Sequence, residues 1–303
     1  RNMFINCALL GMYCKCKIPG KAQHVFDMIP MQDVISWTAL LSGYGENGQV
    51  EEALMCFKRM QLHCVVPNAV TFICCMKACQ DIKYLLRGKE VHVMIETMGL
   101  LPNDLSVGNA LIDMYIKCYT FSMARAVFDR LLIRDVISWT TVLNGYVEHG
   151  LSEQALKCFE EMQVEGVNPN NVAFICGFKA CCQNGSANKA QEMHSQVEKC
   201  GLLDGDLIMG NTLVDIYTKC GLLDMAQKVF DKLPIRNEVS WSTLVAGYTT
   251  QGYGRKALEC FKKMQIENVS PDAVTFICSL KACASIRAVE YSRHVHERIR
   301  LLM

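Results

Sequence analysis

The sequence predicts an all-α protein, an α-solenoid of stacked helix–turn–helix repeats. One observation is an internal repeat, because the stretch Val34–Asn68 returns at Val136–Asn170 and at Glu238–Asp272, with starting positions 102 residues apart. Such regularity over a whole chain is typical of a stacked array. The second observation is that apolar residues of the repeat recur at i, i+3, i+4 and i+7, in two runs on either side of Gly150, as in amphipathic helices.

Each period of 102 residues divides into helix–turn–helix units of 31, 35 and 36 residues. Three periods, the last one truncated, give one solenoid over residues 3–303. Neither helix of a unit can bury its apolar face alone, so stacking on the neighbouring units supplies the core. The predicted units are 3–33, 34–68, 69–104, 105–135, 136–170, 171–206, 207–237, 238–272 and 273–303.

Three recurring residue types mark the expected ends of the helices. A serine before each tryptophan suits an N-cap. A glycine between the two helices suits a left-handed turn, and a proline is expected to stop the second helix. These residues are Ser36, Ser138 and Ser240, then Gly48, Gly150 and Gly252, then Pro67, Pro169 and Pro271.

Composition excludes several classes of protein. The chain is 51% hydrophobic with a formal net charge of +1, which excludes a disordered chain and shows no gross bias toward nucleic acid or membranes. No apolar run approaches the ~20 residues that span a bilayer. Twelve of the 18 cysteines fall in columns of the repeat, and no C-x-x-C pair occurs. We therefore expect buried structural thiols in a reducing compartment, with no metal and no cofactor.

The units resemble the motifs of the pentatricopeptide repeat proteins of plant organelles, in the PLS class that alternates P, L and S motifs. The stretch Val34–Asn68, with V-I-S-W, G-Y, E-A-L and P-N, resembles the P motif. Val70–His92 resembles the L motif, and Val107–Asp129 resembles the S motif. The resemblance covers nearly the whole chain and implies a right-handed superhelix. The uneven triplet argues against tetratricopeptide repeats, whose period is a uniform ~34 residues.

The resemblance implies that the fifth and last residues of each motif contact one RNA base. Ionised Asp accepts the N–H of uracil or guanine, whereas the Asn amide can donate to adenine or cytosine. In the family's pattern, a fifth-position Thr or Ser accompanies purines and Asn accompanies pyrimidines. The implied base-contacting pairs are Thr38/Asn68, Asn109/Asp135, Thr140/Asn170, Asn211/Asn237 and Ser242/Asp272.

These pairs predict the single-stranded target A-N-Y-A-N-Y-G-N, read 5′ to 3′ from the second motif, where Y is a pyrimidine. The L motifs carry Ile73, Ile175 and Ile277 at the fifth position. Isoleucine cannot hydrogen-bond a base, so we expect these motifs to be nearly unselective. The pair Cys7/Asp33 departs from the family's pattern and predicts no base.

The second residue of each motif is implied to sandwich a base against the next motif. Ser106 breaks the aliphatic series in the motif of Asn109/Asp135, which predicts uracil over cytosine, so this base is expected to bind loosely. The alternative for each aliphatic residue is a plain core contact between repeats. The base-sandwiching residues are Ile35, Val70, Ile137, Val172, Ile208, Val239 and Val274.

Six lysines follow the fifth residue at helical spacing, four or eight positions later, and so share its helix face. They could hold RNA phosphates despite the near-zero net charge; the alternative is a solvated helix face. The implied phosphate-binding residues are Lys15, Lys77, Lys117, Lys179, Lys219 and Lys281. The repeating His92, His194 and His296 are expected to be packing or surface residues of the second helices.

We expect no catalytic residues, because the chain lacks the zinc-binding H-x-E and C-x-x-C pattern of the DYW deaminase domain found in many relatives. Since the chain begins at Arg1 rather than Met and stops partway through a repeat, we expect a fragment, one without the E/DYW region. The leading hypothesis is a sequence-specific RNA-binding module for C-to-U editing of an organellar transcript, in the mitochondrion or chloroplast. Implied partners are RNA, multiple organellar RNA editing factors (MORF/RIP) on the L motifs, and a DYW deaminase in cis or trans. The alternative is a peptide-binding scaffold.

Overall fold

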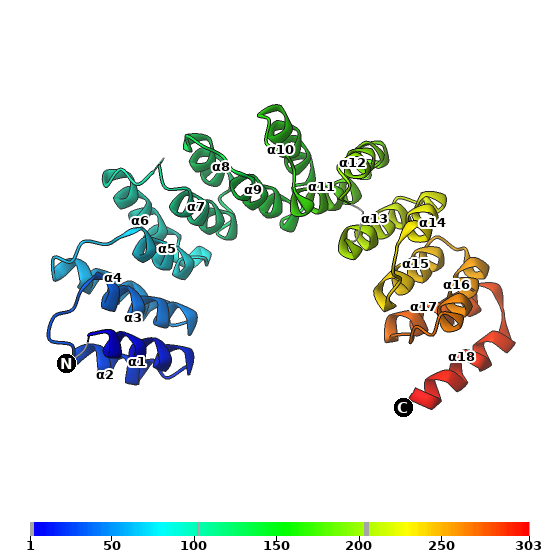
Figure 1. Cartoon of the computed structure of the whole chain (residues 1–303), viewed down its shortest axis with the longest axis horizontal. Coiled ribbons are helices and arrows are strands. Elements are labelled where there is room, and N and C mark those ends of the chain that lie inside the picture. The colour runs from blue at the N-terminus through cyan, green and yellow to red at the C-terminus, as the bar shows by residue number, and fades with distance from the viewer. Residues whose placement is uncertain (1–2, 102, 203–205, 303) are drawn as a thin grey trace. The chain divides into compact units, whose positions relative to one another are not determined.

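The computed structural model describes residues 3–101, 103–202 and 206–302, and every regular element in these ranges is a helix (Figure 1). The chain divides into two compact units, residues 1–146 and 147–303, referred to below as the N-terminal and C-terminal units. The division falls inside one helix, α9 (Val136–Glu148). Met303, the predicted end of the truncated ninth motif, lies outside the described residues.

The helices of each unit follow the predicted hairpins. Before α9, the N-terminal unit contains α1 (Met3–Lys15), α2 (Pro19–Asp27), α3 (Val34–Glu46), α4 (Val50–Leu62), α5 (Ala69–Ala78), the 3-10 helix η1 (Ile82–Tyr84), α6 (Leu85–Thr97), α7 (Leu105–Lys117) and α8 (Phe121–Arg130). The C-terminal unit contains α10 (Ser152–Val164), α11 (Asn171–Asn184), α12 (Ala187–Lys199), α13 (Leu207–Lys219), α14 (Leu223–Lys232), α15 (Glu238–Thr250), α16 (Gly254–Ile266), α17 (Ala273–Ile286) and α18 (Val289–Leu302).

The first helices of successive hairpins form one packed layer within each unit (Figure 1). In the N-terminal unit α1, α3, α5 and α7 pack in that order, and in the C-terminal unit α11, α13, α15 and α17 do the same. Each of these helices also packs against the second helix of its own hairpin, as α3 does against α4. The predicted all-α solenoid of stacked hairpins is therefore confirmed, while its right-handed sense stays a prediction.

The first helix of each motif begins one residue after an Asp or Asn. Asp33 precedes α3 and its carboxylate accepts from the Ser36 amide at 2.9 Å, and Asn237 precedes α15 and accepts from the Ser240 amide at 3.0 Å. The expectation that Ser36, Ser138 and Ser240 are N-caps is therefore wrong. Each serine is the third helical residue and fully buried. The acidic or amide side chain, three positions earlier, has the reach to cap this amide.

The turns inside the hairpins have the predicted geometry, but the prolines do not end the second helices. Gly48, Gly150 and Gly252 have φ values of +74°, +72° and +81°, a conformation that only glycine adopts without steric cost. The helices before Pro67, Pro169 and Pro271 already end at Leu62, Val164 and Ile266. A left-handed residue ends each of them, namely Cys64, Gly166 and Asn268. The prolines lie in the linker that follows.

A tryptophan and a phenylalanine anchor each junction from an S motif to the P motif that follows it. The ring centroids of Phe128 and Trp139 lie 4.7 Å apart, and those of Phe230 and Trp241 lie 4.6 Å apart, both edge to face. Most of the described cysteines are buried, and none forms a disulfide. Burial raises the pKa of Cys56 to about 12, so this thiol packs as a neutral apolar group. No described helix has the length and apolar character needed to cross a bilayer.

Candidate nucleic-acid interface

The last residue of each of the first eight motifs is the N-cap of the next hairpin. Asn68 Oδ1 accepts from the Thr71 amide at 2.9 Å, and Asp135 Oδ1 accepts from the Ser138 amide at 2.8 Å. Equivalent hydrogen bonds hold Asn170, Asn237 and Asp272. In the described structure, none of these five side chains has a hydrogen bond to its other polar atom. The cap therefore leaves Nδ2 of each Asn, or Oδ2 of each Asp, available to a ligand.

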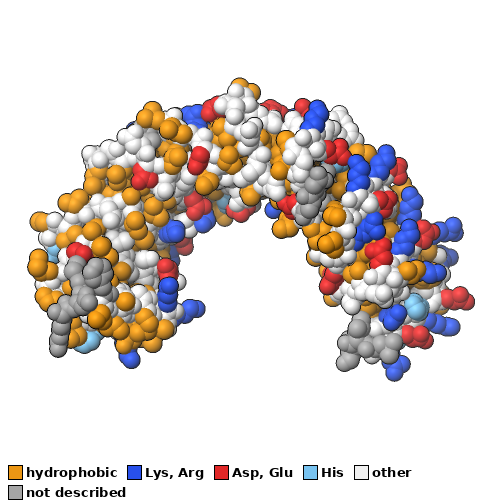
Figure 2. Space-filling model, in the orientation of Figure 1, with side chains coloured by type: hydrophobic (Ala, Val, Ile, Leu, Met, Phe, Trp, Pro, Cys, Tyr) orange, Lys and Arg blue, Asp and Glu red, His pale blue; other side chains and the backbone are white. Residues whose placement is uncertain are grey.

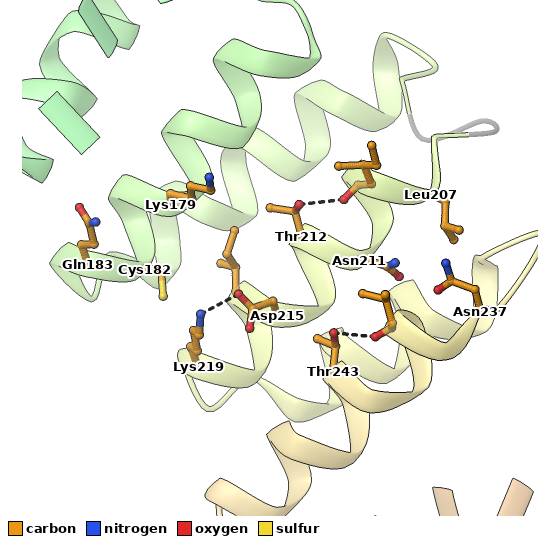
Figure 3. Close-up of a pocket in the computed structure, with 13 residues that line it drawn as sticks. Lys179, Cys182, Gln183, Leu207, Asn211, Thr212, Asp215, Lys219, Asn237 and Thr243 are labelled. Atoms are coloured by element: carbon orange, nitrogen blue, oxygen red, sulfur yellow. Dashed lines mark hydrogen bonds and ion pairs between the residues drawn. The ribbon is translucent and has the colours of Figure 1, made fainter. Parts of the chain in front are cut away.

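A pocket of about 600 Å³ in the C-terminal unit brings predicted residues of three kinds together (Figure 3). Its lining includes Asn211 from α13 and Asn237 at the start of α15, which form one predicted base-contacting pair. Two predicted base-sandwiching residues and two predicted phosphate-binding residues also line it: Ile208, Val239, Lys179 and Lys219. In Figure 3 the two asparagines lie on one side of the pocket and the two lysines on the other.

The two fifth-position asparagines share an unusual feature. Oδ1 of Asn109 and Oδ1 of Asn211 are both buried without a hydrogen-bond partner in the described structure. Buried polar atoms in native proteins nearly always have partners, so such atoms need an explanation. Turning either amide outward breaks no protein hydrogen bond of this oxygen, which leaves the side chain free to adapt to a ligand.

The fifth-position hydroxyls are less available than these amides. Thr38 is only 8% exposed, and its Oγ1 lies 2.7 Å from Thr71 Oγ1, which donates to the capping oxygen of Asn68 at 2.9 Å. Thr71 thus bridges the predicted pair Thr38/Asn68. Ser242 donates to the carbonyl of its own helix at Val239 (3.1 Å), and Thr140 donates in the same way at 3.0 Å. Each hydroxyl already donates its proton within the protein, so it can only accept a hydrogen bond from a ligand.

The seven predicted base-sandwiching residues are all exposed. Their exposed fractions run from 51% for Val172 to 70% for Ile208. This exposure excludes the alternative, a buried core contact between repeats, while contact with a base stays a prediction. Exposed apolar side chains lie among charged ones on the surfaces of both units (Figure 2). The other members of the series are Ile35, Val70, Ile137, Val239 and Val274.

The six lysines are all exposed, but two of them have acidic partners. Lys117 Nζ lies 3.1 Å from Asp113 Oδ2, and Lys219 Nζ lies 2.7 Å from Asp215 Oδ2. The hydrogen bond to Asp215 raises the pKa of Lys219. Lysines four residues after an aspartate are a signal visible in the sequence, which sequence reasoning missed. No hydrogen bond or ion pair is seen among the described residues for Lys15, Lys77, Lys179 and Lys281.

Lys117 has one more hydrogen-bond partner than Lys219 in the described structure, because a glutamine from the preceding L motif joins its ion pair. Gln80 Nε2 donates to Asp113 Oδ2 at 2.6 Å, and Lys117 Nζ donates to Gln80 Oε1 at 2.9 Å. The counterpart of Gln80, 102 residues later, is Cys182. A thiol cannot reproduce this pair of hydrogen bonds, so Lys219 keeps one partner.

The L motifs have apolar fifth residues and capping last residues. Ile73 and Ile175 are half-buried, and Ile277 is exposed. Asp104 caps α7 and Asp206 caps α13, each through Oδ1 to two backbone amides. In the first motif Asp33 likewise caps α3, while Cys7 is half-buried; burial, and then the charge of Asp33, raise the pKa of its thiol.

The histidines belong to the packing between L and S motifs and lie on the second helices. His92 Nδ1 lies 2.7 Å from the Tyr115 hydroxyl, and His194 Nδ1 lies 2.7 Å from the Tyr217 hydroxyl. Both histidines are buried, and burial lowers their pKa values against the raising effect of a neighbouring glutamate. His296 is exposed. No group of three or more His, Cys, Asp or Glu side chains in the described ranges could hold a metal ion.

Comparison with known proteins finds the same repeat. The family model described as PPR repeat family matches residues 32–81, 134–183 and 236–285, and the model described as PPR repeat matches residues 178–202 and 211–237. Together the two models match more than half of the chain.

Similar proteins occur in Arabidopsis thaliana. The chloroplastic pentatricopeptide repeat-containing protein At4g18520 is 32% identical over 97% of this chain and 48% of its own length. The putative mitochondrial pentatricopeptide repeat-containing protein At3g13770 is 35% identical over 93% of this chain and 45% of its own length. The chain thus spans less than half the length of these relatives, whose names place them in organelles.

Solved structures of a pentatricopeptide repeat protein share the fold. The crystal structure of PPR10 in complex with an 18-nt psaJ RNA element superposes with a TM-score of 0.72 and 20% identity, over 92% of this chain and 42% of that one. The crystal structure of PPR10 from maize gives a TM-score of 0.58 and 14% identity, over 100% of this chain and 54% of that one. With the 102-residue period, the capped hairpins and the family models in agreement, this chain belongs to the pentatricopeptide repeat family.

Proposed function

We propose that this chain binds single-stranded RNA in a sequence-specific manner, with about one base per repeat. The observation that carries the proposal is the pocket around Asn211 and Asn237, which combines two amides, two exposed aliphatic side chains and two lysines. A nucleotide needs these three kinds of contact: polar groups for the edge of the base, apolar groups for its faces and cations for its phosphate. The PPR10 structure with an RNA element supports the same class of ligand.

The capping geometry supplies a physical basis for base selection. Asn237 and Asp135 both spend Oδ1 on the helix that follows, so their backbones and capping bonds are alike. They differ in the remaining atom, which is a donor in Asn237 and an acceptor in Asp135. The donor suits cytosine N3 or adenine N1, and the acceptor suits the N–H of uracil or guanine. An exchange of Asn for Asp therefore changes base preference while it keeps the cap.

The exposed aliphatic residues would hold the base in place. Ile208 and Val239 lie at the second position of consecutive motifs and both line the pocket. A base between them would cover apolar surface that is now 70% and 54% exposed, which favours binding without selecting a base. Lys179 and Lys219 would contact phosphates and fix the register.

The organellar names of the relatives support a mitochondrial or chloroplast location for this chain. Within that setting we place the module on a transcript that contains A-N-Y-A-N-Y-G-N, where it would position C-to-U editing. The PLS alternation, MORF-type partners on the L motifs, and a DYW deaminase in cis or trans belong to this proposal. The chain itself then contributes recognition and no catalysis.

Binding of fluorescent oligonucleotides tests the proposal directly. We expect the A-N-Y-A-N-Y-G-N RNA to bind more tightly than a scrambled RNA and than the matching DNA. Equal binding of all three, or none, would overturn the proposal and favour a peptide-binding scaffold.

The base preference is tested by Asn237→Asp. This exchange keeps the cap and should move the preference at the sixth nucleotide from cytosine toward uracil by about tenfold, the value of one or two hydrogen bonds. Asp135→Asn is the matched control and should move the third nucleotide in the opposite direction. A preference that does not move in either variant would contradict the assignment of motif positions to bases.

A further inference from the structure

The two complete L motifs carry the same predicted pair, Ile and Asp, but their aspartates have different surroundings. We infer that Asn171 switches off base selection by Asp206, whereas Asp104 retains it. The inference rests on the proposed function and refines it, because the sequence pattern alone predicts the same weak selectivity for both motifs. Asn171 would thus be a specificity-determining residue that need not touch the base.

The contacts of Asp206 occupy both of its carboxylate oxygens. Oδ1 caps α13 by accepting from the amides of Ile208 at 2.9 Å and Met209 at 3.1 Å. Oδ2 accepts a hydrogen bond from Nδ2 of Asn171, the first residue of the same motif. The atom that the other motifs leave available is here bonded to a protein donor.

The contacts of Asp104 occupy one oxygen. Oδ1 accepts from the amides of Ser106 at 2.9 Å and Val107 at 3.1 Å, the same capping geometry as at Asp206. No donor to Oδ2 is seen in the described part of the chain. The first residue of this motif is Ala69, which has no polar side-chain atom. The two L motifs therefore differ at Oδ2 because of a single residue.

The different surroundings of the two aspartates matter because, in each L-motif pair of isoleucine and aspartate, only the aspartate is polar. Ile73 and Ile175 offer nothing to the edge of a base, so selection in an L motif depends on the aspartate alone. A free Oδ2 accepts the N–H of uracil or guanine and repels the acceptor of cytosine or adenine. The amide of Asn171 uses a lone pair of Oδ2 and offsets part of its charge. The free energy gained when Oδ2 accepts a hydrogen bond from a base N–H is therefore smaller.

Asn171 is the one amide at the first position of any motif whose last residue the structure describes. The other first residues are Met3, Val34, Ala69, Leu105, Val136, Leu207 and Glu238. Six of these seven are apolar and cannot donate to the last residue, and Glu238 has only acceptors when ionised. Interference with the free atom of the last residue is thus expected in the motif of Asn171 alone.

The test varies one nucleotide at a time in the A-N-Y-A-N-Y-G-N RNA. The second nucleotide faces the Asp104 motif, and the fifth faces the Asp206 motif. We expect the unmodified chain to prefer uracil and guanine over cytosine and adenine by about fivefold at the second nucleotide, the value of one hydrogen bond. At the fifth nucleotide we expect less than twofold. Equal preferences at both nucleotides would overturn the inference.

Two reciprocal exchanges test whether the first residue of the motif causes the difference between Asp104 and Asp206. Asn171→Ala copies Ala69 and should create the fivefold preference at the fifth nucleotide. Ala69→Asn copies Asn171 and should abolish the preference at the second. A second variant, Asn171→Leu, copies Leu207 and guards against an effect peculiar to alanine. If both Asn171 variants remain unselective at the fifth nucleotide, Asn171 does not control Asp206.

The Asn237→Asp variant, measured with the same RNAs, separates the two possible failures. If Asn237→Asp shifts preference at the sixth nucleotide while the Asn171 variants change nothing, the inference fails and the proposed function stands. If Asn237→Asp changes nothing either, the proposed base contacts fail. Circular dichroism and thermal melting of each variant establish that the chain is folded in every binding measurement.

Discussion

Two S motifs, Leu105–Asp135 in the N-terminal unit and Leu207–Asn237 in the C-terminal unit, form a natural comparison. Their helices have identical lengths, and each motif joins the following P motif through the same edge-to-face pair of phenylalanine and tryptophan. Each carries a fifth-position asparagine with a buried, unpartnered Oδ1. The two motifs therefore share their helix lengths and the aromatic contact that joins each to its P motif.

Several differences between these motifs lie on the predicted RNA-binding face, while others are buried, such as Ile112 against Val214 and Met114 against Ile216. The last residue is Asp135 in one and Asn237 in the other, and the second residue is Ser106 in one and Ile208 in the other. Gln80 holds the ion pair of Lys117, whereas Cys182 leaves that of Lys219 without a third member. The comparison teaches that the second residue and the lysine, which are exposed, can be changed with little effect on packing, whereas the last residue also caps the next helix.

The largest effect is expected from the shared framework. Trp139→Ala and Trp241→Ala each remove a side chain that is at most 2% exposed, and each should lower the free energy of unfolding by about 3–5 kcal/mol. Chemical denaturation measures the loss. Because the two phenylalanine–tryptophan contacts match, the two losses should agree within about 1 kcal/mol; a large disagreement would show that the motifs are not equivalent in packing.

The matched control is replacement by phenylalanine. Nε1 of both indoles is buried without a partner in the described structure, so Trp139→Phe and Trp241→Phe lose packing but also remove an unsatisfied donor. These replacements should lower the free energy of unfolding by less than half as much as the alanine replacements do. A phenylalanine variant as unstable as the alanine variant would mean that the indole has a partner not seen here.

The second residue should have the next largest effect, and it acts on RNA affinity. Ser106→Ile supplies the missing aliphatic contact and should tighten binding of the predicted RNA about fivefold, and Ile208→Ser should weaken it by a similar factor. Anisotropy titrations at fixed salt measure both. Since residue 208 is 70% exposed, stability should barely change, and an unfolded Ile208→Ser variant would restore the core-contact interpretation.

The lysines should have a smaller effect that is uniform across RNA sequences. Lys219→Ala should weaken every RNA about threefold and lower the slope of log affinity against log salt by about 0.7. Lys117→Ala should weaken RNA binding less, because the ammonium of Lys117 already contacts Asp113 and Gln80. In a Gln80→Cys background, which copies Cys182, the two lysines should become equivalent. A loss confined to one RNA sequence would exclude a phosphate contact.

The smallest effect is expected from the buried histidines, through the pH dependence of stability. Burial lowers the pKa values of His92 and His194 below the ordinary 6.5, although Glu96 and Glu198 oppose this and Arg130 and Lys232 reinforce it. The unfolded chain then binds more protons than the folded one. Stability contributed by the neutral histidines is present above about pH 6.5 and is lost as the pH falls toward the folded pKa values.

Denaturation at pH 8 and at pH 5 measures this loss. His92→Gln and His194→Gln keep an acceptor for Tyr115 and Tyr217, which face the two histidines, and each should flatten the pH dependence slightly. The exposed His296 is the control, and His296→Gln should leave it unchanged. An equal response of all three variants would exclude burial as the cause.

The repeat pattern predicts the helices well because hairpin stacking repeats the same local rules. The first helices begin at the first residues of the predicted motifs, from Val34 to Ala273, three residues before the start that the serine caps would give at Trp37, Trp139 and Trp241. The N-cap prediction is wrong because D-x-x-S, or N-x-x-S in the third copy, contains two capping residues, and the earlier one reaches the amide of the later one. The proline does not end the second helix as predicted, because a left-handed residue such as Gly166 already ends it before Pro169.

The candidate interface is harder to predict than the helices, because exposure and pairing depend on packing between motifs. The second-position series is visible in the sequence, but only the structure shows that it is exposed. The contact between Asn171 and Asp206 joins residues 35 positions apart. No local pattern predicts it, because Ala69 occupies the same place in the other complete L motif. The roles of these residues toward RNA stay predictions.

In the proposed function the last residue both caps the next helix and contacts a base, which restricts how such an array can be reprogrammed. A side chain that starts the next helix can be exchanged at little cost only for another good starter, chiefly Asn, Asp, Ser or Thr. Any other choice loosens the seam between two hairpins by about 1 kcal/mol, whatever it does for the nucleotide. Few residue types can therefore be used at the last position. In a long array, any other residue type there also weakens the packing of the neighbouring hairpins.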